Sequence, residues 1–131
     1  MKSIDHAKHN ESVCNYLGRN SAFGDWVITS AFYSAMHYVR HLMIPATIDG
    51  HTYTDFDSLF LSQKKMMEGR HGFMKDYVVR NFSEIGIYYC RLHDMSTTAR
   101  YINYVFTREQ SNMAKKYLGV IKEYVINKKP E

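Results

Sequence analysis

The chain contains little proline, cysteine or glycine for its length, with 2 Pro, 2 Cys and 7 Gly among 131 residues. So few prolines exclude a proline-rich disordered segment and favour long, uninterrupted helices. Cys14 and Cys90 lie far apart within helical patterns and lack metal-ligand spacing, so we expect free, buried thiols. No apolar run approaches the roughly 20 residues that cross a bilayer, and residues 1–12 are too polar for a signal peptide. We therefore expect a cytoplasmic protein with no membrane partner.

Several enzyme signatures are also missing from the sequence. It has no glycine-rich phosphate loop, no Gly-x-Ser-x-Gly elbow, no paired-cysteine zinc pattern and no metalloprotease motif. The formal net charge of +4 permits an anionic partner but does not by itself indicate nucleic acid. With 45% hydrophobic residues, the chain is long enough for one core, so we predict a single domain over residues 1–131.

The spacing of apolar residues predicts an all-α, up-and-down bundle of four main helices with additional short helices. The expected helices cover residues 3–17, 25–44, 57–67 and 71–82, followed by one from about residue 85 and one after a capping box of Thr107 and Gln110. The apolar run from Ala99 to Phe106 either continues the helix from residue 85 or starts another, and we favour a continuation with a bend near Ser96. No window alternates apolar and polar residues, so residues 46–54 are predicted to be an exposed connection that turns at Asp49-Gly50.

The expected helix 25–44 carries two stripes at helical spacing. The core stripe is apolar and consists of Ile28, Phe32, Ala35, Met36, Val39 and Met43. The neighbouring stripe mixes aromatic rings with polar and titratable groups: Trp26, Ser30, Tyr33, His37, Arg40, His41 and Ile44. A helix with a purely structural role normally carries solvated Lys and Glu at such positions. The second stripe therefore indicates a polar seam inside or beside the bundle.

His37 is the first candidate for chemistry, because an imidazole exchanges protons near neutral pH and Tyr33, one turn earlier, is placed to orient it. The structural alternative is a partly buried histidine that donates to a neighbouring helix. His37 and His41, also one turn apart, would chelate a metal only if a third ligand such as His71 or His93 converged on them. No acidic residue stands at a recognisable spacing, so we predict no metal and no cofactor.

Two further candidates combine a cation with a titratable or aromatic neighbour. Arg70 and His71 follow Gly69 and begin a predicted helix, where free backbone amides favour phosphate. The alternative there is an exposed turn. Arg100 is flanked by Tyr101, an arrangement that suits a phosphate or a stacked base but equally an ion pair in helix packing.

Three segments together resemble the HEPN family of helical domains, over about residues 5–127. They are Asp25-Trp26 to Phe32-Tyr33-Ser34-Ala35-Met36-His37, then Gly69-Arg70-His71, then Tyr89-x-x-Leu92-x-x-x-Ser96-x-x-Ala99-Arg100-Tyr101. The resemblance implies an up-and-down bundle, often a homodimer, that works in toxin or anti-invader systems or beside a nucleotidyltransferase partner. Many members are metal-independent ribonucleases that use an arginine followed, after four to six residues, by a histidine. No arginine here has that spacing; Lys65 and His71 have it, but with lysine in place of arginine.

Three hypotheses follow from the residues and the resemblance. The first is a HEPN-like module that binds RNA, a nucleotide or a partner protein without cleavage, with His37, His71 and Arg100 as its central site and Tyr33, Arg70 and Tyr101 as ligand contacts. The second is a metal-independent ribonuclease with an altered site, in which a histidine removes the 2′-hydroxyl proton and an arginine stabilises the phosphorane. The third is a metal-dependent bundle enzyme similar to the DinB group, which needs three converging histidines.

Overall fold

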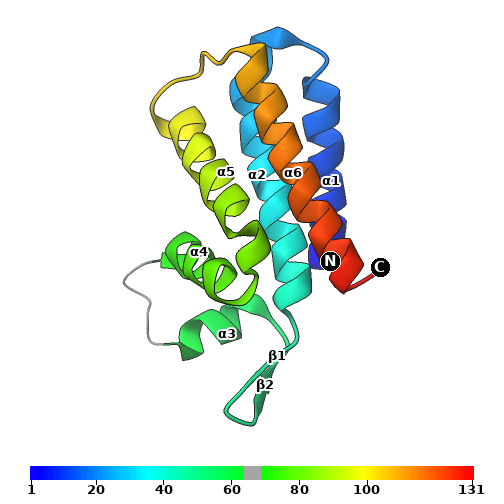
Figure 1. The fold of residues 1–131 in the computed structure, drawn as a ribbon, viewed down its shortest axis with the longest axis vertical. Coiled ribbons are helices and arrows are strands. Elements are labelled where there is room, and N and C mark those ends of the chain that lie inside the picture. Colours follow the sequence, from blue (N-terminus) through cyan, green and yellow to red (C-terminus); the bar gives the residue numbers. More distant parts are fainter. Residues whose placement is uncertain (64–68) are drawn as a thin grey trace.

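The computed structural model describes residues 1–63 and 69–131 and confirms the predicted all-α class (Figure 1). Four long helices run along the molecule, and shorter elements gather at one end. The elements are α1 Ser3–Leu17, η1 Ser21–Phe23, α2 Gly24–Met43, β1 Ala46–Ile48, β2 His51–Tyr53, α3 Phe56–Ser62, α4 Gly69–Asn81, α5 Ser83–Tyr101 and α6 Arg108–Lys128. The bundle of four main helices consists of α1, α2, α5 and α6, as the sequence predicts.

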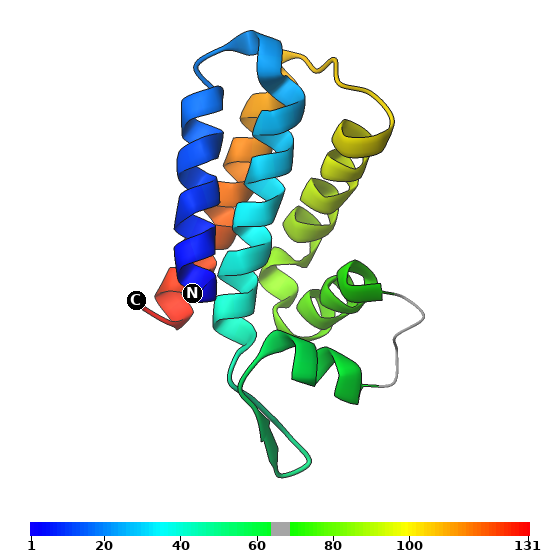
Figure 2. The ribbon, with the colours of Figure 1, turned by 180° about the vertical axis from the view of Figure 1, so that it is seen from behind.

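Helix α2 lies at the centre of this bundle. It packs against α1, α5 and α6, while α4 packs against α5 (Figures 1 and 2). The core stripe predicted for this helix is buried: Ile28, Phe32, Ala35 and Val39 are 0% exposed, and Met36 and Met43 are at most 5% exposed. The apolar spacing of α2 therefore reports its buried face correctly, because three neighbours leave little of the helix in contact with water.

Polar contacts join the packed helices α1, α2 and α6. The phenol of Tyr38 donates to Glu11 Oε1 at 2.7 Å, and Lys122 Nζ donates to both carboxylate oxygens of Glu11 at 3.0 and 3.1 Å. The buried hydroxyl of Ser34 donates to the Ala7 carbonyl at 2.7 Å. The hydroxyl groups of Ser34 and Tyr38 on α2 thus find their partners on α1, which fixes how the two helices are rotated relative to each other.

The segment after α2 differs from the prediction, because it forms a short antiparallel hairpin. Ala46 pairs with Tyr53 and Ile48 with His51. Asp49 and Gly50 both have positive φ, at 51° and 78°, which fits a two-residue hairpin turn. The sequence does carry the turn signal, but strands of three residues are too short for alternation to be visible.

Helix α5 differs from the prediction at its end: it runs through Ser96, but it stops at Tyr101 instead of continuing toward Phe106. The Ser96 hydroxyl donates to the His93 carbonyl of its own helix at 2.8 Å, so the serine is accommodated inside it. The apolar residues Ile102 and Val105 lie outside any helix and are 75% and 67% exposed. Apolar spacing beyond Tyr101 therefore did not report a buried helical face.

Smaller differences occur at the helix ends. Helix α3 begins at Phe56, with Asp55 as its N-cap, and ends at Ser62; the predicted end at Met67 lies outside the described residues. Cys14 and Cys90 are free thiols, and Cys14 is fully buried whereas Cys90 is half-buried. Among residues 1–63 and 69–131, no helix has the length and apolar character to cross a membrane.

Candidate functional site

Arg100, in the last turn of α5, is held in place by three hydrogen bonds. Its Nε donates to the Ser96 carbonyl at 3.2 Å, its Nη2 to Ser96 Oγ at 3.3 Å, and its Nη1 to the phenol oxygen of Tyr33 on α2 at 3.0 Å. The guanidinium carbon also lies 5.5 Å from the ring centre of Tyr33 and 5.1 Å from that of Tyr101. All of these partners are uncharged, and within the described parts of the chain no carboxylate pairs with Arg100.

Two histidines lie side by side next to this arginine. The rings of His71 on α4 and His93 on α5 are 5.3 Å apart between centres, and both pack on Phe32, at 5.5 and 5.3 Å. The guanidinium carbon of Arg100 lies 5.8 Å from the same Phe32 ring. Phe32 is therefore the common support of a group that we name the His/Arg cluster, consisting of His71, His93 and Arg100.

The two imidazoles have different hydrogen-bond partners. His93 Nδ1 lies 3.3 Å from Asp94 Oδ1, and Lys75 Nζ donates to the same carboxylate oxygen at 3.1 Å. His71 Nδ1 is buried and has no hydrogen-bond partner among the described residues. A buried polar atom without a partner is uncommon in a folded protein. His71 is therefore the member of the cluster with a ring nitrogen left open.

Both histidines of the cluster are uncharged near neutral pH. Burial lowers the pKa of His71 below 6.5, and the neighbouring His93 and the charges of Arg100 and Arg40 lower it further. Burial also lowers the pKa of His93, although its hydrogen bond to Asp94 acts in the opposite direction. Each imidazole can thus accept a proton, while Arg100 supplies the permanent positive charge.

The structure places His37 in a different environment from His71 and Arg100. The His37 ring stacks on His6 of α1, with 4.8 Å between the ring centres. Burial, the charge of Arg40 and the neighbouring His6 lower the pKa of His37 to about 4. Its Nδ1 is also buried without a partner in the described part of the chain. His37 therefore lies on the same stripe of α2 as Tyr33, but its ring contact is with α1.

The remaining residues selected from the sequence are arranged around the cluster or apart from it. Tyr33 and Tyr101 both contact Arg100, and Tyr101 is 75% exposed. Arg70 is exposed at the start of α4, where its Nε donates to Asp57 Oδ1 at 3.1 Å and its guanidinium lies 5.0 Å from the Phe60 ring. Arg70 is thus paired with a carboxylate, unlike Arg100. Lys65 lies outside the described residues.

The sequence indicates His93 as a possible third metal ligand, and the structure instead places it beside His71 and near Arg100. Its spacing from Arg100 is seven residues, which places both side chains on one face of a helix two turns apart. That spacing is a readable signal, because α5 is continuous from Ser83 to Tyr101.

No metal site is evident in the part of the chain that the structure describes, since no three His, Cys, Asp or Glu side chains converge there. Comparison of the chain with models of protein families, with curated proteins and with solved structures finds no match. The function must therefore be argued from the geometry of the cluster itself.

Proposed function

We propose that this protein is a HEPN-like helical module that binds single-stranded RNA at the His/Arg cluster. The observation that carries the proposal is Arg100, a half-buried guanidinium that has only neutral partners in the described residues. A cation held without a counter-ion, with its hydrogen-bond donors fixed, favours an anion such as a phosphate. The Tyr33 and Ser96 oxygens that it now contacts are neutral and can be exchanged for phosphate oxygens.

The surroundings of Arg100 support RNA over a free anion. Tyr101 is 75% exposed and Tyr104 is 73% exposed, so both rings are accessible directly after the arginine. Exposed aromatic rings beside a cation suit unstacked bases attached to a phosphate backbone. The net charge of +4 favours association with a polyanion. The role in defence, the homodimer and a nucleotidyltransferase or other protein partner remain predictions from the resemblance.

Replacing Arg100 by glutamine is expected to weaken binding of a fluorescently labelled single-stranded RNA by at least about tenfold, because a phosphate contact is lost. Fluorescence anisotropy at several salt concentrations measures the change. The slope of the logarithm of affinity against the logarithm of salt concentration should fall by about one, because one fewer counterion is released. Arg91→Gln is the matched control, since Arg91 is an exposed arginine on the same helix. Equal losses in Arg91→Gln and Arg100→Gln, or unchanged binding in Arg100→Gln, would refute the cluster as the RNA site.

A second candidate, a metal-independent ribonuclease, is favoured by the pair of uncharged imidazoles. His71 would take the proton of the 2′-hydroxyl, whose oxygen then attacks phosphorus. Arg100 would stabilise the phosphorane, and the 5′-oxygen would leave with the proton that His71 has taken up. The products would be a 2′,3′-cyclic phosphate and a 5′-hydroxyl. No metal is required, because the nucleophile belongs to the substrate.

Incubation of the protein with RNA in excess chelator separates the two candidates. If the chain is a ribonuclease, cleavage persists in chelator, and His71→Gln slows it by about 10²–10⁴-fold because the base is lost. His51→Gln, which alters an exposed histidine on β2, should leave the rate unchanged. Intact RNA with undiminished binding would exclude the nuclease and leave the binding module.

A further inference from the structure

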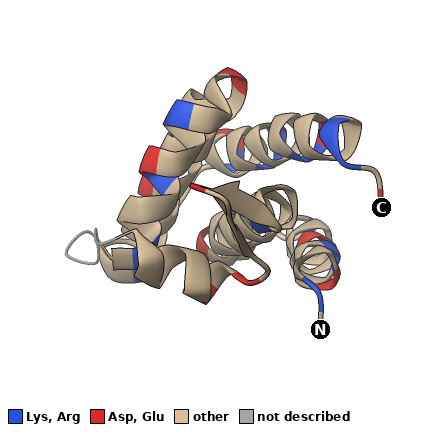
Figure 3. Ribbon diagram, turned by 90° about the horizontal axis from the view of Figure 1, so that it is seen from below, with Lys and Arg blue, Asp and Glu red and all other residues tan. Residues whose placement is uncertain are grey.

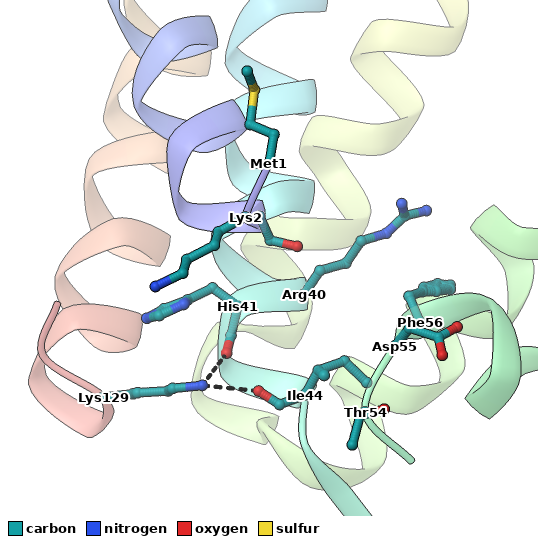
Figure 4. A pocket seen from close by; sticks show the side chains of 10 residues that line it. Met1, Lys2, Arg40, His41, Ile44, Thr54, Asp55, Phe56 and Lys129 are labelled. Carbon is teal, nitrogen blue, oxygen red and sulfur yellow. Dashed lines mark hydrogen bonds between the residues drawn. The ribbon is translucent and has the colours of Figure 1, made fainter.

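A pocket of about 480 Å³ lies toward the end of the bundle opposite the α5–α6 connection, where the two ends of the chain lie near each other (Figures 1 and 4). It lies among the start of α1, the last turn of α2, the entry to α3 and the residue after α6. Its lining includes Lys2, Arg40, His41, Ile44, Phe56 and Lys129. Figure 3 views the molecule from this end of the bundle and shows Lys and Arg positions near both the N-terminus and the C-terminus. The pocket shares no residue with the His/Arg cluster.

One side of the pocket is positively charged. Lys129 Nζ donates to the carbonyls of His41 and Ile44 at 2.9 and 2.8 Å, which fixes its ammonium group at the end of α2. Lys2 extends toward the His41 ring on the same side (Figure 4). Burial lowers the pKa of His41, and the charges of Lys129 and Lys2 lower it further, whereas a hydrogen bond with Lys129 and the carboxylate of Glu131 act in the opposite direction. Both ammonium groups are therefore close enough to act on the ring. Nε2 of His41 is buried with no partner in the described residues.

This charge is not neutralised by the acidic residue of the lining. Asp55 is the N-cap of α3, and its carboxylate accepts hydrogen bonds from the backbone amide and hydroxyl of Ser58, both at 2.8 Å. Lys2 forms no ion pair within residues 1–63 and 69–131. Among the described residues, the lining thus holds three permanent cations, Lys2, Arg40 and Lys129, and one carboxylate that is already engaged. The carboxylates of Glu131 and Asp57 act from outside the lining, and both are paired: Glu131 with Lys8 and Asp57 with Arg70.

The opposite side of the pocket is apolar and aromatic. The guanidinium carbon of Arg40 lies 3.9 Å from the centre of the Phe56 ring, and its Nε donates to Met74 Sδ at 3.4 Å. These contacts fix the arginine between the charged side and Phe56. Ile44 adds an aliphatic surface to the lining. The pocket thus combines a cationic end with an apolar end within a volume typical of small-molecule sites.

We propose that this pocket binds a small phosphate monoester whose phosphate lies among Lys2, His41 and Lys129 and whose apolar or aromatic body lies against Ile44 and Phe56. A phosphate dianion would offset the excess positive charge and accept hydrogen bonds from the ammonium groups of Lys2 and Lys129. An apolar body would displace water from Ile44 and from the small part of Phe56 that is not buried, since Phe56 is 8% exposed. The proposed site is independent of RNA binding at Arg100.

Isothermal titration calorimetry with phenyl phosphate tests the proposal on the full chain. We expect one saturable site, with inorganic phosphate and phenol each binding at least about tenfold more weakly because each lacks half of the ligand. Lys2→Gln should weaken phenyl phosphate about tenfold or more, as expected for the loss of a charge-assisted contact. The matched control is Lys116→Gln, which alters an exposed lysine in α6 far from the pocket lining. Circular dichroism verifies that each variant is folded.

This assignment would be overturned by the absence of saturable binding, by equal binding of phenol or of inorganic phosphate, or by the same loss in Lys116→Gln as in Lys2→Gln. Arg100→Gln distinguishes the pocket from the RNA site, because it should weaken RNA binding but leave phenyl phosphate binding unchanged. If Arg100→Gln abolishes phenyl phosphate binding, the ligand occupies the His/Arg cluster and the second site does not exist.

Discussion

Replacing Phe32 by alanine is expected to lower the free energy of unfolding by about 3–5 kcal/mol, the usual range for removing a buried aromatic ring. Phe32 is 0% exposed and lies in the central helix, so its loss leaves a cavity that the packed neighbours cannot fill. Its ring contacts Tyr33, Tyr89, His71 and His93. The same substitution therefore removes the support of both imidazoles. Urea unfolding followed by circular dichroism measures the loss of stability.

Two companion variants sharpen this test. Ile87→Ala, at a position on α5 that is 54% exposed, should change stability by no more than about 0.5 kcal/mol. Phe32→Leu keeps an apolar side chain and should preserve the fold, but the smaller group admits water to His71 and His93. Histidine titration by NMR should then show their pKa values moving up toward 6.5. A loss below about 1 kcal/mol in Phe32→Ala would mean that this ring does not anchor the core.

Acidification from pH 7 to pH 4 is expected to destabilise the fold through its histidines. Burial lowers the pKa of His37 to about 4, and the pKa values of His41, His71 and His93 are lowered mainly by burial as well. Histidines in the unfolded chain bind protons near pH 6.5. Below that pH the unfolded chain therefore binds more protons than the folded chain, and this difference favours unfolding. Stability is therefore full above about pH 6.5 and declines as the pH falls toward 4. The slope is at most about 1.4 kcal/mol per pH unit for each histidine, and less here because water screens these partly exposed rings.

Urea unfolding at pH 7.5, 6.0 and 5.0 measures this decline. His37→Gln should flatten the curve, because it removes the histidine with the lowest pKa value, whereas His51→Gln in the exposed hairpin should not. Carboxylates act in a separate window: hydrogen bonds from Ser58 lower the pKa of Asp55, so its contribution is lost only below about pH 4. A stability that stays constant between pH 7.5 and 5.0 would contradict the burial of these imidazoles.

The helices were predictable from the sequence wherever packing and local spacing agree. The core stripe of α2 and the capping box of Thr107 and Gln110 at the start of α6 both occur as expected. The hairpin was missed because its three-residue strands carry no periodic pattern, and the end of α5 was misplaced because Ile102 and Val105 are apolar yet exposed. Periodicity indicates which residues could share a buried face, but it does not establish that a partner covers that face.

The candidate site was less predictable, because it depends on contacts between distant helices. The contact between Tyr33 and Arg100 joins residues 67 positions apart, and the neighbour of His71 is His93 on another helix. The stacking of His37 on His6 depends on how α1 rotates against α2, which the weakly apolar sequence of α1 leaves open. Residue types and helical faces were readable from the sequence, whereas the pairing of those faces was not.

The central position of α2 also constrains the order in which the chain can fold. Helices α1 and α2 are consecutive and can form a helical hairpin early, because the loop between them is short. The remaining face of α2 is covered by α5 and α6, and α6 ends at Lys128, three residues before the end of the sequence. During synthesis on the ribosome, α2 therefore exposes apolar side chains until α6 has emerged. Completion of the core, and with it the support of the His/Arg cluster, must wait for α6.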